Sequence, residues 1–245
     1  MKIADPLALK AKLPKSIIVF AASQLNGDRE TQEDFFENYN DECFVLADGV
    51  GGIPNGEIAA KIAVETAIWG YKLIRQRSFY WQDKKLFMKR IFRSTNIALW
   101  QKKRETGFEE GLATTLEVLV VGDRIFWLGH VGDSSSWLLH NDTFTKLTID
   151  DADTHGYLTK VVGTKRYGLI PQYITGLFLP GDTMVIVSDG VTSALDKESI
   201  KKIIRDSGNT TESITKTVLE LLKKAEDQGG TDNMTAIIVK RIATR

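Results

Sequence analysis

The sequence has one cysteine and no excess of either charge. Cys43 cannot form a disulfide within the chain, and a single thiol cannot supply a zinc–thiolate site. The 32 basic residues balance the 32 acidic residues, so no overall positive field draws the chain to nucleic acid or to an anionic membrane. These absences exclude a disulfide-stabilised mini-protein, and they predict neither nucleic-acid nor membrane binding.

Long apolar runs, internal repeats and low-complexity linkers are also absent. No apolar run approaches the roughly 20 residues that cross a bilayer, and the first residues, 1–6, lack the apolar core of a signal peptide. With 245 residues and 42% hydrophobic side chains, the composition is that of an ordinary globular chain. We therefore expect a single domain over residues 1–245, located in the cytoplasm.

Hydrophobic periodicity predicts blocks of strands alternating with helices. Strands are expected at 16–22, 42–47, 115–121, 124–130, 135–140, 143–147, 173–179, 183–188 and 234–242. Helical spacing occurs at 58–75, 86–99, 200–204 and 214–222, with Asp196 and Asn209 as N-caps of the last two. Because hairpins join most strands, the pattern predicts an α+β fold in which antiparallel sheets pack together with helix pairs outside.

Acidic residues stand where several predicted apolar strands end. They lie in Asp48-Gly49-Val50-Gly51-Gly52, Gly132-Asp133-Ser134, Ser188-Asp189-Gly190 and Gly230-Thr231-Asp232-Asn233, with a further polar group at residues 29–34. A single Asp-Gly pair is most simply a turn. The repetition, however, indicates carboxylates held on a rigid scaffold, with glycines that let backbone groups approach a ligand.

Convergence of these acids would create a cation site. Two carboxylates about 4 Å apart repel by roughly 4 kcal/mol at an effective dielectric constant near 20, so a cluster must either raise its pKa values or bind cations. An all-oxygen set suits Mg²⁺ or Mn²⁺, and His130, His140 and His155 show no metal-ligand spacing. A two-metal carboxylate site with Arg29 beside it to bind phosphate is typical of a phosphoryl hydrolase.

The order of these motifs resembles the metal-dependent protein phosphatase family, the protein phosphatase 2C type, and especially its compact bacterial members. The resemblance runs from about residue 23 to 239. It rests on Arg29-Glu30-Thr31-Gln32-Glu33-Asp34, on the Asp48–Gly52 element, on Gly111-Leu112-Ala113-Thr114-Thr115, and on the motifs that contain Asp133, Asp189 and Asp232-Asn233. It implies a four-layer αββα sandwich, two central antiparallel sheets flanked by pairs of helices.

The resemblance also implies an activity, its cofactors and its residues. The activity is hydrolysis of phosphoserine and phosphothreonine in proteins by direct attack of a hydroxide that bridges two Mn²⁺ or Mg²⁺ ions, with a third ion in bacterial members. Arg29 would hold the substrate phosphate. The implied metal ligands are Asp48 as the bridge, the Gly49 carbonyl, Asp189 and Asp232 at one ion, Glu33 and Asp34 at the other, and Asp133 shared with Asp189 at the third, with Asn233 orienting Asp232.

The sequence departs from the family pattern without losing an expected ligand. Val50 stands where many eukaryotic relatives have histidine, so a metal-bound water would have to protonate the leaving group. Ala113 replaces a glycine, Ser135 stands where arginine is common, and residues 150–153 keep only a trace of a histidine-containing loop. The long excursion at 150–168 would form a flap beside the site.

Two other interpretations stay open. A catalytically silent, phosphoprotein-binding scaffold could share the fold, although the intact acidic residues argue against it. A nucleotide-binding turn at Gly51-Gly52 lacks the Walker lysine and the Gly-x-Gly-x-x-Gly spacing. The expected partners are phosphorylated proteins together with a cognate serine/threonine kinase or its targets, and a monomer is expected. The aromatic run Phe79-Tyr80-Trp81 could dock a partner, although packing is the simpler interpretation.

Overall fold

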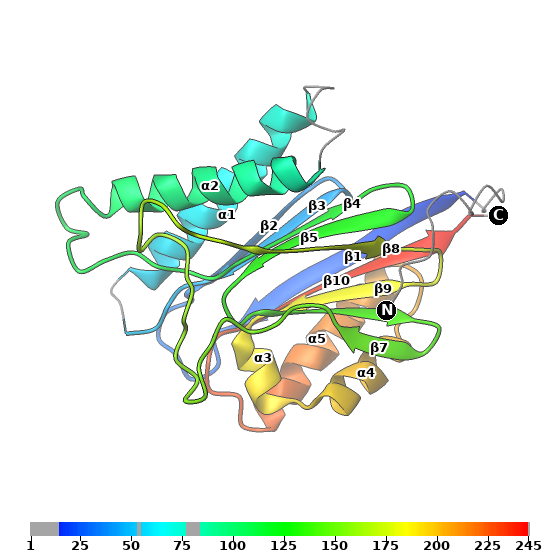
Figure 1. Cartoon of the computed structure of the whole chain (residues 1–245). Coiled ribbons are helices and arrows are strands. Elements are labelled where there is room, and N and C mark those ends of the chain that lie inside the picture. The colour runs from blue at the N-terminus through cyan, green and yellow to red at the C-terminus, as the bar shows by residue number, and fades with distance from the viewer. Residues whose placement is uncertain (1–14, 53–54, 77–83, 245) are drawn as a thin grey trace.

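The computed structural model describes residues 15–52, 55–76 and 84–244, in which two antiparallel sheets pack face to face (Figure 1). The run Phe79-Tyr80-Trp81 lies outside the described residues. The first sheet has the order β1 (Ser16–Leu25), β10 (Met234–Ala243), β9 (Thr183–Val187), β6 (Ser135–His140), β7 (Thr143–Lys146). The second has the order β2 (Asp34–Tyr39), β3 (Cys43–Asp48), β4 (Leu116–Val121), β5 (Ile125–Val131), β8 (Gln172–Leu177).

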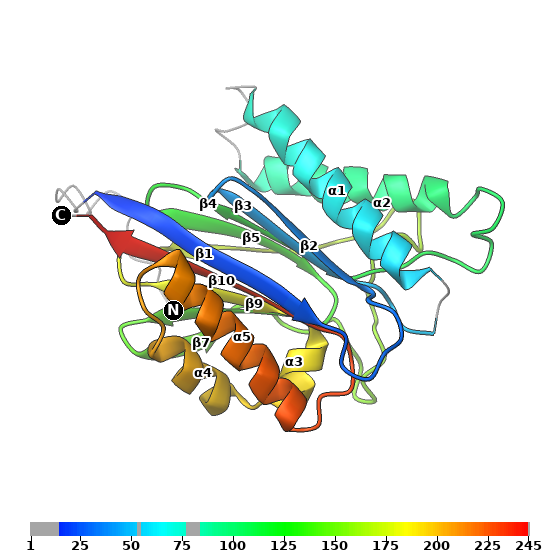
Figure 2. The same cartoon turned by 180° about the vertical axis from the view of Figure 1, so that it is seen from behind.

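Helices cover the outer face of each sheet (Figure 1, Figure 2). On the sheet that contains β3 lie α1 (Gly56–Arg75) and α2 (Lys84–Lys102), and on the sheet that contains β10 lie α3 (Asp189–Ala194), α4 (Lys197–Arg205) and α5 (Thr211–Asp227). The four layers confirm the predicted αββα sandwich. The second helical layer differs from the expected pair, because the short helix α3 begins just after β9, where no helix was predicted.

The central strands are apolar along their whole length because both of their faces are covered. In β3, Phe44 and Leu46 pack between the sheets, whereas Val45 and Ala47 pack against the layer of α1 and α2. All four side chains are fully buried. Burying an aliphatic or aromatic side chain contributes about 1.5–3 kcal/mol. The core therefore holds the ends of the central strands rigidly, and those ends carry the acidic residues.

Two local predictions from the sequence need correction. Residues 34–39, where no strand was predicted, form the edge strand β2, whose side chains are only partly buried beyond Asp34. The N-cap of α5 is Thr210 rather than Asn209. The Thr210 hydroxyl accepts from the Ser213 amide, and the Ser213 hydroxyl accepts from the Thr210 amide, which together form a capping box. The Asp196 N-cap of α4 is confirmed by its bond from the Ser199 amide, at 2.8 Å.

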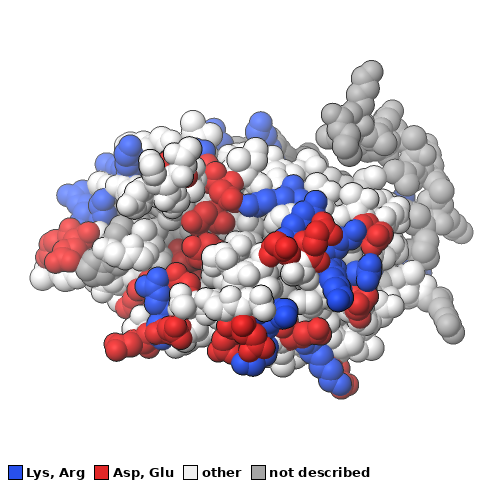
Figure 3. Space-filling model, turned by 90° about the horizontal axis from the view of Figure 1, so that it is seen from below, with Lys and Arg blue, Asp and Glu red and all other residues white. Residues whose placement is uncertain are grey.

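The surface carries charges of both signs. On the face seen in Figure 3, acidic and basic side chains are interspersed, and one run of acidic side chains crosses the left part of the view. None of the helices that the structure describes combines the length and the apolar character needed to span a bilayer.

Candidate active site

Strand ends bring the acidic residues to one end of the sandwich. Asp48 is the last residue of β3, Asp133 and Asp189 follow β5 and β9, and Asp232 precedes β10. Because neighbouring strands run in opposite directions, ends of β3, β5 and β9 and the start of β10 meet at the same edge. There they line a pocket of about 70 Å³, whose walls are Arg29, Glu33, Asp48, Gly49, Val50, Gly51, Thr115, Asp133, Leu158, Asp189, Asp232 and Asn233.

Three carboxylates form the centre of this pocket. Asp48, Asp133 and Asp189 each place an oxygen within 4.8 Å of the other two. Burial raises the pKa of Asp48 well above its ordinary value, and repulsion by Asp34 and Asp189 raises it further. Burial likewise raises the pKa of Asp133, to about 6. The protein thus holds like charges together at a cost that a bound cation would remove.

Asp34 lies behind the pocket rather than in its wall. It pairs with Asp48 across β2 and β3 and is 2% exposed. Its Oδ2 accepts a hydrogen bond from the Ser188 hydroxyl at 2.7 Å, whereas Oδ1 is buried and has no partner among the described residues. Burial raises the pKa of Asp34 to about 7, against the opposing hydrogen bond from the Ser188 hydroxyl.

The Gly-x-x-Thr-Thr segment fixes the backbone at Asp48. The Asp48 amide donates to the Thr115 hydroxyl at 2.9 Å, and the Asp48 carbonyl accepts from the Thr114 hydroxyl at 2.7 Å. Thr115 also contacts Ser134 Oγ at 3.1 Å, which links the ends of β4 and β5. At Gly49 a Cβ would lie 2.4 Å from the carbonyl of Gly56, so glycine is required where α1 begins over the pocket.

Asn233 joins the N-terminal and C-terminal parts of the site. Its Nδ2 donates to the carbonyls of Asn26 and Thr31, both at 3.0 Å, and its Oδ1 accepts from the Glu33 amide at 2.8 Å. One amide side chain thereby fixes the loop that follows β1. The same loop carries Arg29 and Glu33, so Asn233 orients both relative to its neighbour, Asp232.

Arg29 and Asp232 form an ion pair at the mouth of the pocket. Arg29 Nη2 lies 2.8 Å from Asp232 Oδ2, and the two side chains are 52% and 39% exposed. Glu33 lies deeper, where burial followed by the charge of Glu57 raises its pKa. A guanidinium at the open edge of a pocket can turn from a carboxylate to an entering phosphate. Either anion can accept two parallel hydrogen bonds from its N–H groups.

All of the site residues expected from the sequence meet here, with Asp34 behind and the others in the wall. Three further groups were not assigned a role from the sequence: the Thr115 and Ser188 hydroxyls, which hold Asp48 and Asp34, and Leu158 in the pocket wall. Thr115 belongs to the motif Gly111–Thr115, so the sequence does contain a signal for it. Nothing in the local sequence marks Leu158.

The flap, residues 150–168, is attached to the sheet and to α2. The Asp151 amide donates to the Gly132 carbonyl at 2.7 Å, and the Asp151 carboxylate binds Lys160 Nζ at 2.5 Å. Val162 exchanges backbone bonds with Thr114 at 2.9 and 3.2 Å. The flap therefore has a defined path that carries Leu158 to the pocket.

The comparisons with known sequences all find protein phosphatases. The sequence model of the family described as protein phosphatase 2C matches residues 23–229. The serine/threonine phosphatase stp of Listeria innocua is 25% identical over 239 residues, covering 84% of this chain and 87% of its own length. The protein phosphatase PhpP of Streptococcus pneumoniae is 25% identical over 237 residues, covering 86% of this chain and 92% of its own.

Solved structures share the fold. The serine/threonine phosphatase PstP/Ppp of Mycobacterium tuberculosis superposes with a TM-score of 0.79 at 21% identity, covering 91% of this chain and 98% of that one. The catalytic domain of PstP in complex with two manganese ions gives a TM-score of 0.79 at 22% identity, covering 93% and 100%. The arrangement of layers and strands is therefore the one found in these proteins.

Proposed function

Because this chain belongs to the protein phosphatase 2C family, we propose that it is a hydrolase that removes phosphate from phosphoserine and phosphothreonine in proteins, with Mn²⁺ or Mg²⁺ as cofactor. The observation that carries the proposal is the meeting of Asp48, Asp133 and Asp189 in one pocket that Arg29 borders. The curated relatives named as phosphatases match most of the chain, which supports the same activity.

The donor set fits divalent ions that prefer oxygen. The pocket offers clustered carboxylates with raised pKa values and no nitrogen or sulfur ligand among the described wall residues. Behind the wall, the buried Oδ1 of Asp34 has no hydrogen-bond partner among the described residues, so it remains available as an acceptor. The residues that would hold such ions are Asp48, Asp189, Asp232, Glu33, Asp133 and the Gly49 carbonyl, with Asp34 behind them, where it would hold coordinated water.

The ions, when bound, supply Lewis-acid charge and lower the pKa of coordinated water to near 7 in favourable cases. The side chains of the protein bind the phosphate and position the metal-binding residues. Arg29 holds the phosphate oxygens at the pocket mouth, and Thr115 with Thr114 keeps the Asp48 backbone from shifting. Asn233 keeps the loop that carries Arg29 and Glu33 in place. Positioning of this kind accounts for much of the acceleration in phosphoryl transfer.

Protonation of the leaving oxygen does not come from residue 50. Val50 lines the pocket and has no proton to give. No histidine lines the pocket among the described residues: His130 is held by Glu117 at 2.8 Å and His140 by Asp182 at 2.7 Å. We expect the serine or threonine alkoxide to take its proton from a water in the pocket.

The test is hydrolysis of p-nitrophenyl phosphate with Mn²⁺, with and without chelator, by the wild-type chain and by Asp189→Asn. We expect chelator and Asp189→Asn each to abolish turnover, while the circular dichroism spectrum of the variant is unchanged. Asp206→Asn, at an exposed carboxylate whose ion pair is with the adjacent Arg205, is the matched control and stays active. Near-normal turnover by Asp189→Asn with Mn²⁺ would refute the ligand assignment, and an inactive wild type would favour the silent scaffold.

We also propose that the chain acts as one catalytic domain and as a monomer on targets of a serine/threonine kinase in the same cell. A cytoplasmic location stays a prediction that rests on the single cysteine, Cys43, which is buried and free. Gel filtration at micromolar concentration tests the monomer directly.

A further inference from the structure

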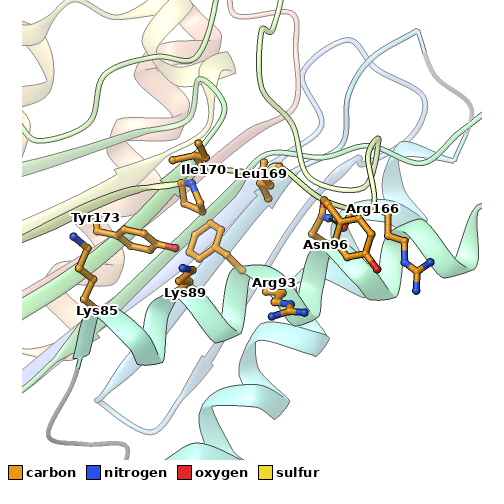
Figure 4. A pocket seen from close by; sticks show the side chains of 12 residues that line it. Lys85, Lys89, Arg93, Asn96, Arg166, Leu169, Ile170 and Tyr173 are labelled. Carbon is orange, nitrogen blue, oxygen red and sulfur yellow. Dashed lines mark hydrogen bonds between the residues drawn. The ribbon is translucent and has the colours of Figure 1, made fainter.

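A groove of about 460 Å³ lies between α2 and the chain that leads from the flap into β8 (Figure 4). Its floor is apolar: Phe92 of α2 and Tyr173 of β8 meet edge to face, with ring centroids 6.2 Å apart. Its rim carries two large apolar side chains that remain open to solvent, since Ile170 is 72% and Tyr167 is 63% exposed. A groove of this size, with an apolar floor, accommodates a few side chains of a ligand.

Cations border the groove on both sides. Lys85, Lys89 and Arg93 follow one another at intervals of four residues on α2 and line the groove, and Figure 4 labels all three on that helix. In the part of the chain that the structure describes, no carboxylate forms an ion pair with any of the three. Like charges four apart on a helix repel by about 0.2–0.5 kcal/mol per pair.

The opposite wall adds a fourth cation. The guanidinium of Arg166 lies over the rings of Trp100 and Tyr167, 5.0 Å from each centroid. No acidic side chain lines the groove among the described residues. In a chain of zero net charge, four cations around one apolar depression indicate an anionic ligand with an apolar part.

The groove is fixed before any ligand arrives. Asn96 of α2 is 3% exposed, and its Nδ2 donates to the carbonyls of Lys165 and Arg166 at 2.8 and 3.3 Å. Its Oδ1 accepts from the Gly163 amide at 3.0 Å. One buried side chain thus ties the flap wall to α2. A wall held in this way loses little conformational freedom when a ligand binds, which favours affinity.

The groove is continuous with the active site over the surface of the flap. Leu158 lines the active-site pocket and also a neighbouring depression of about 370 Å³. That depression shares Asn96 and residues 168–170 with the groove. A chain that presents its phosphorylated residue to the pocket can therefore follow the flap to α2 without leaving the protein surface.

We propose that this groove binds an acidic segment of the phosphoprotein substrate, separate in sequence from the phosphorylated residue. The proposal rests on the phosphatase function proposed above. Aspartate or glutamate side chains of the segment pair with Lys85, Lys89 and Arg93. An aromatic or aliphatic side chain of the segment packs on Tyr173 and on the exposed Ile170. The narrow apolar floor favours a peptide over a nucleic acid or an anionic membrane, which need a broad basic surface.

Direct binding tests the groove independently of catalysis. The probe is a fluorescent peptide of about 12 residues, rich in glutamate and aspartate, with one phenylalanine and no phosphate, measured by anisotropy in chelator. We expect binding to wild type that weakens with salt, and a loss of about tenfold or more in Lys89→Glu/Arg93→Glu. Lys197→Glu/Lys202→Glu, which makes the same charge change at exposed lysines of α4, is the matched control and binds as wild type does.

Kinetics gives a second readout. A phosphothreonine peptide joined by a flexible linker to the acidic segment should show a KM about fivefold or more below that of the phosphothreonine peptide alone. Lys89→Glu/Arg93→Glu should lose this advantage. The inference is overturned if that variant binds the acidic peptide like wild type, or if wild type ignores the peptide and binds anionic vesicles or RNA. Turnover of p-nitrophenyl phosphate by wild type reports separately on the phosphatase function.

Discussion

The metal-free protein is expected to lose stability as pH rises from 5 to 8. The pKa of Asp34 is raised to about 7 and that of Asp133 to about 6, in both cases first of all by burial, from an ordinary value of 3.8. The folded chain therefore holds these protons more tightly than the unfolded chain. Stability from such a group is complete below pH 3.8 and is lost as pH rises through the folded-state pKa.

The magnitude follows from the two pKa values. Between pH 5 and pH 8, the free energy of unfolding falls by about 3 kcal/mol through Asp34 and by about 1 kcal/mol through Asp133. Since 1 kcal/mol shifts the melting temperature by about 2–4 °C in a chain of this size, the drop is on the order of 10 °C. Bound Mn²⁺ neutralises the carboxylates, so the saturated protein should melt higher at pH 8 and show a flatter pH profile.

Differential scanning fluorimetry in chelator, from pH 5 to 8, measures this effect. Asp34→Asn is the informative variant, because an amide keeps an acceptor for the Ser188 hydroxyl but cannot titrate. It should remove the share of the pH dependence that Asp34 contributes, while Asp48 and Asp133 continue to titrate, and it should leave the melting temperature at pH 8 higher than that of wild type. A metal-free melting temperature that is flat or rises over this range would refute the electrostatic reasoning, as would an Asp34→Asn profile that parallels wild type.

Three further predictions concern single residues. Arg29→Ala should lower kcat/KM for a phosphopeptide by about ten- to a hundredfold, the loss of charge-assisted bonds to phosphate, in steady-state assays; an unchanged value would show that Arg29 does not hold the substrate. Gly190→Ala should cost about 3 kcal/mol in urea unfolding, because its Cβ would lie 2.1 Å from the Asn233 carbonyl oxygen, whereas Gly51→Ala meets nothing within 4 Å and should fold normally. Asp196→Ala should lower the midpoint of urea unfolding by removing the N-cap of α4, and an unchanged midpoint would mean that the cap is dispensable.

The sequence predicted the fold best where local and tertiary signals agree. The continuous apolar run of β3 followed by Asp48-Gly49 is visible in the sequence because both faces of that strand are buried. The edge strand β2 was missed because its outer side meets solvent and its side chains are half-buried, which blurs the alternation. Six-residue α3 was missed because so short a helix has too few turns for a periodic pattern.

The site could be predicted in composition but not in arrangement. The sequence shows which acidic residues converge, because most of them stand beside glycines at the ends of predicted strands. Whether an acid lines the pocket or lies behind it depends on strand register, which puts Asp34 opposite Asp48 and out of the wall. The groove beside α2 depends on Asn96 holding residues about 70 positions away, and no local pattern encodes that contact.

The pairing of β1 with β10, in register from Ser16 with Ala243 to Leu25 with Met234, has a consequence for biosynthesis. Of the strands that the structure describes, β1 is synthesised first, and the edge that pairs with β10 stays unfilled until β10 has been made. Asp232 and Asn233 reach Arg29 and Glu33 only in that last step. Until β10 has been translated, a nascent chain therefore has no complete catalytic centre.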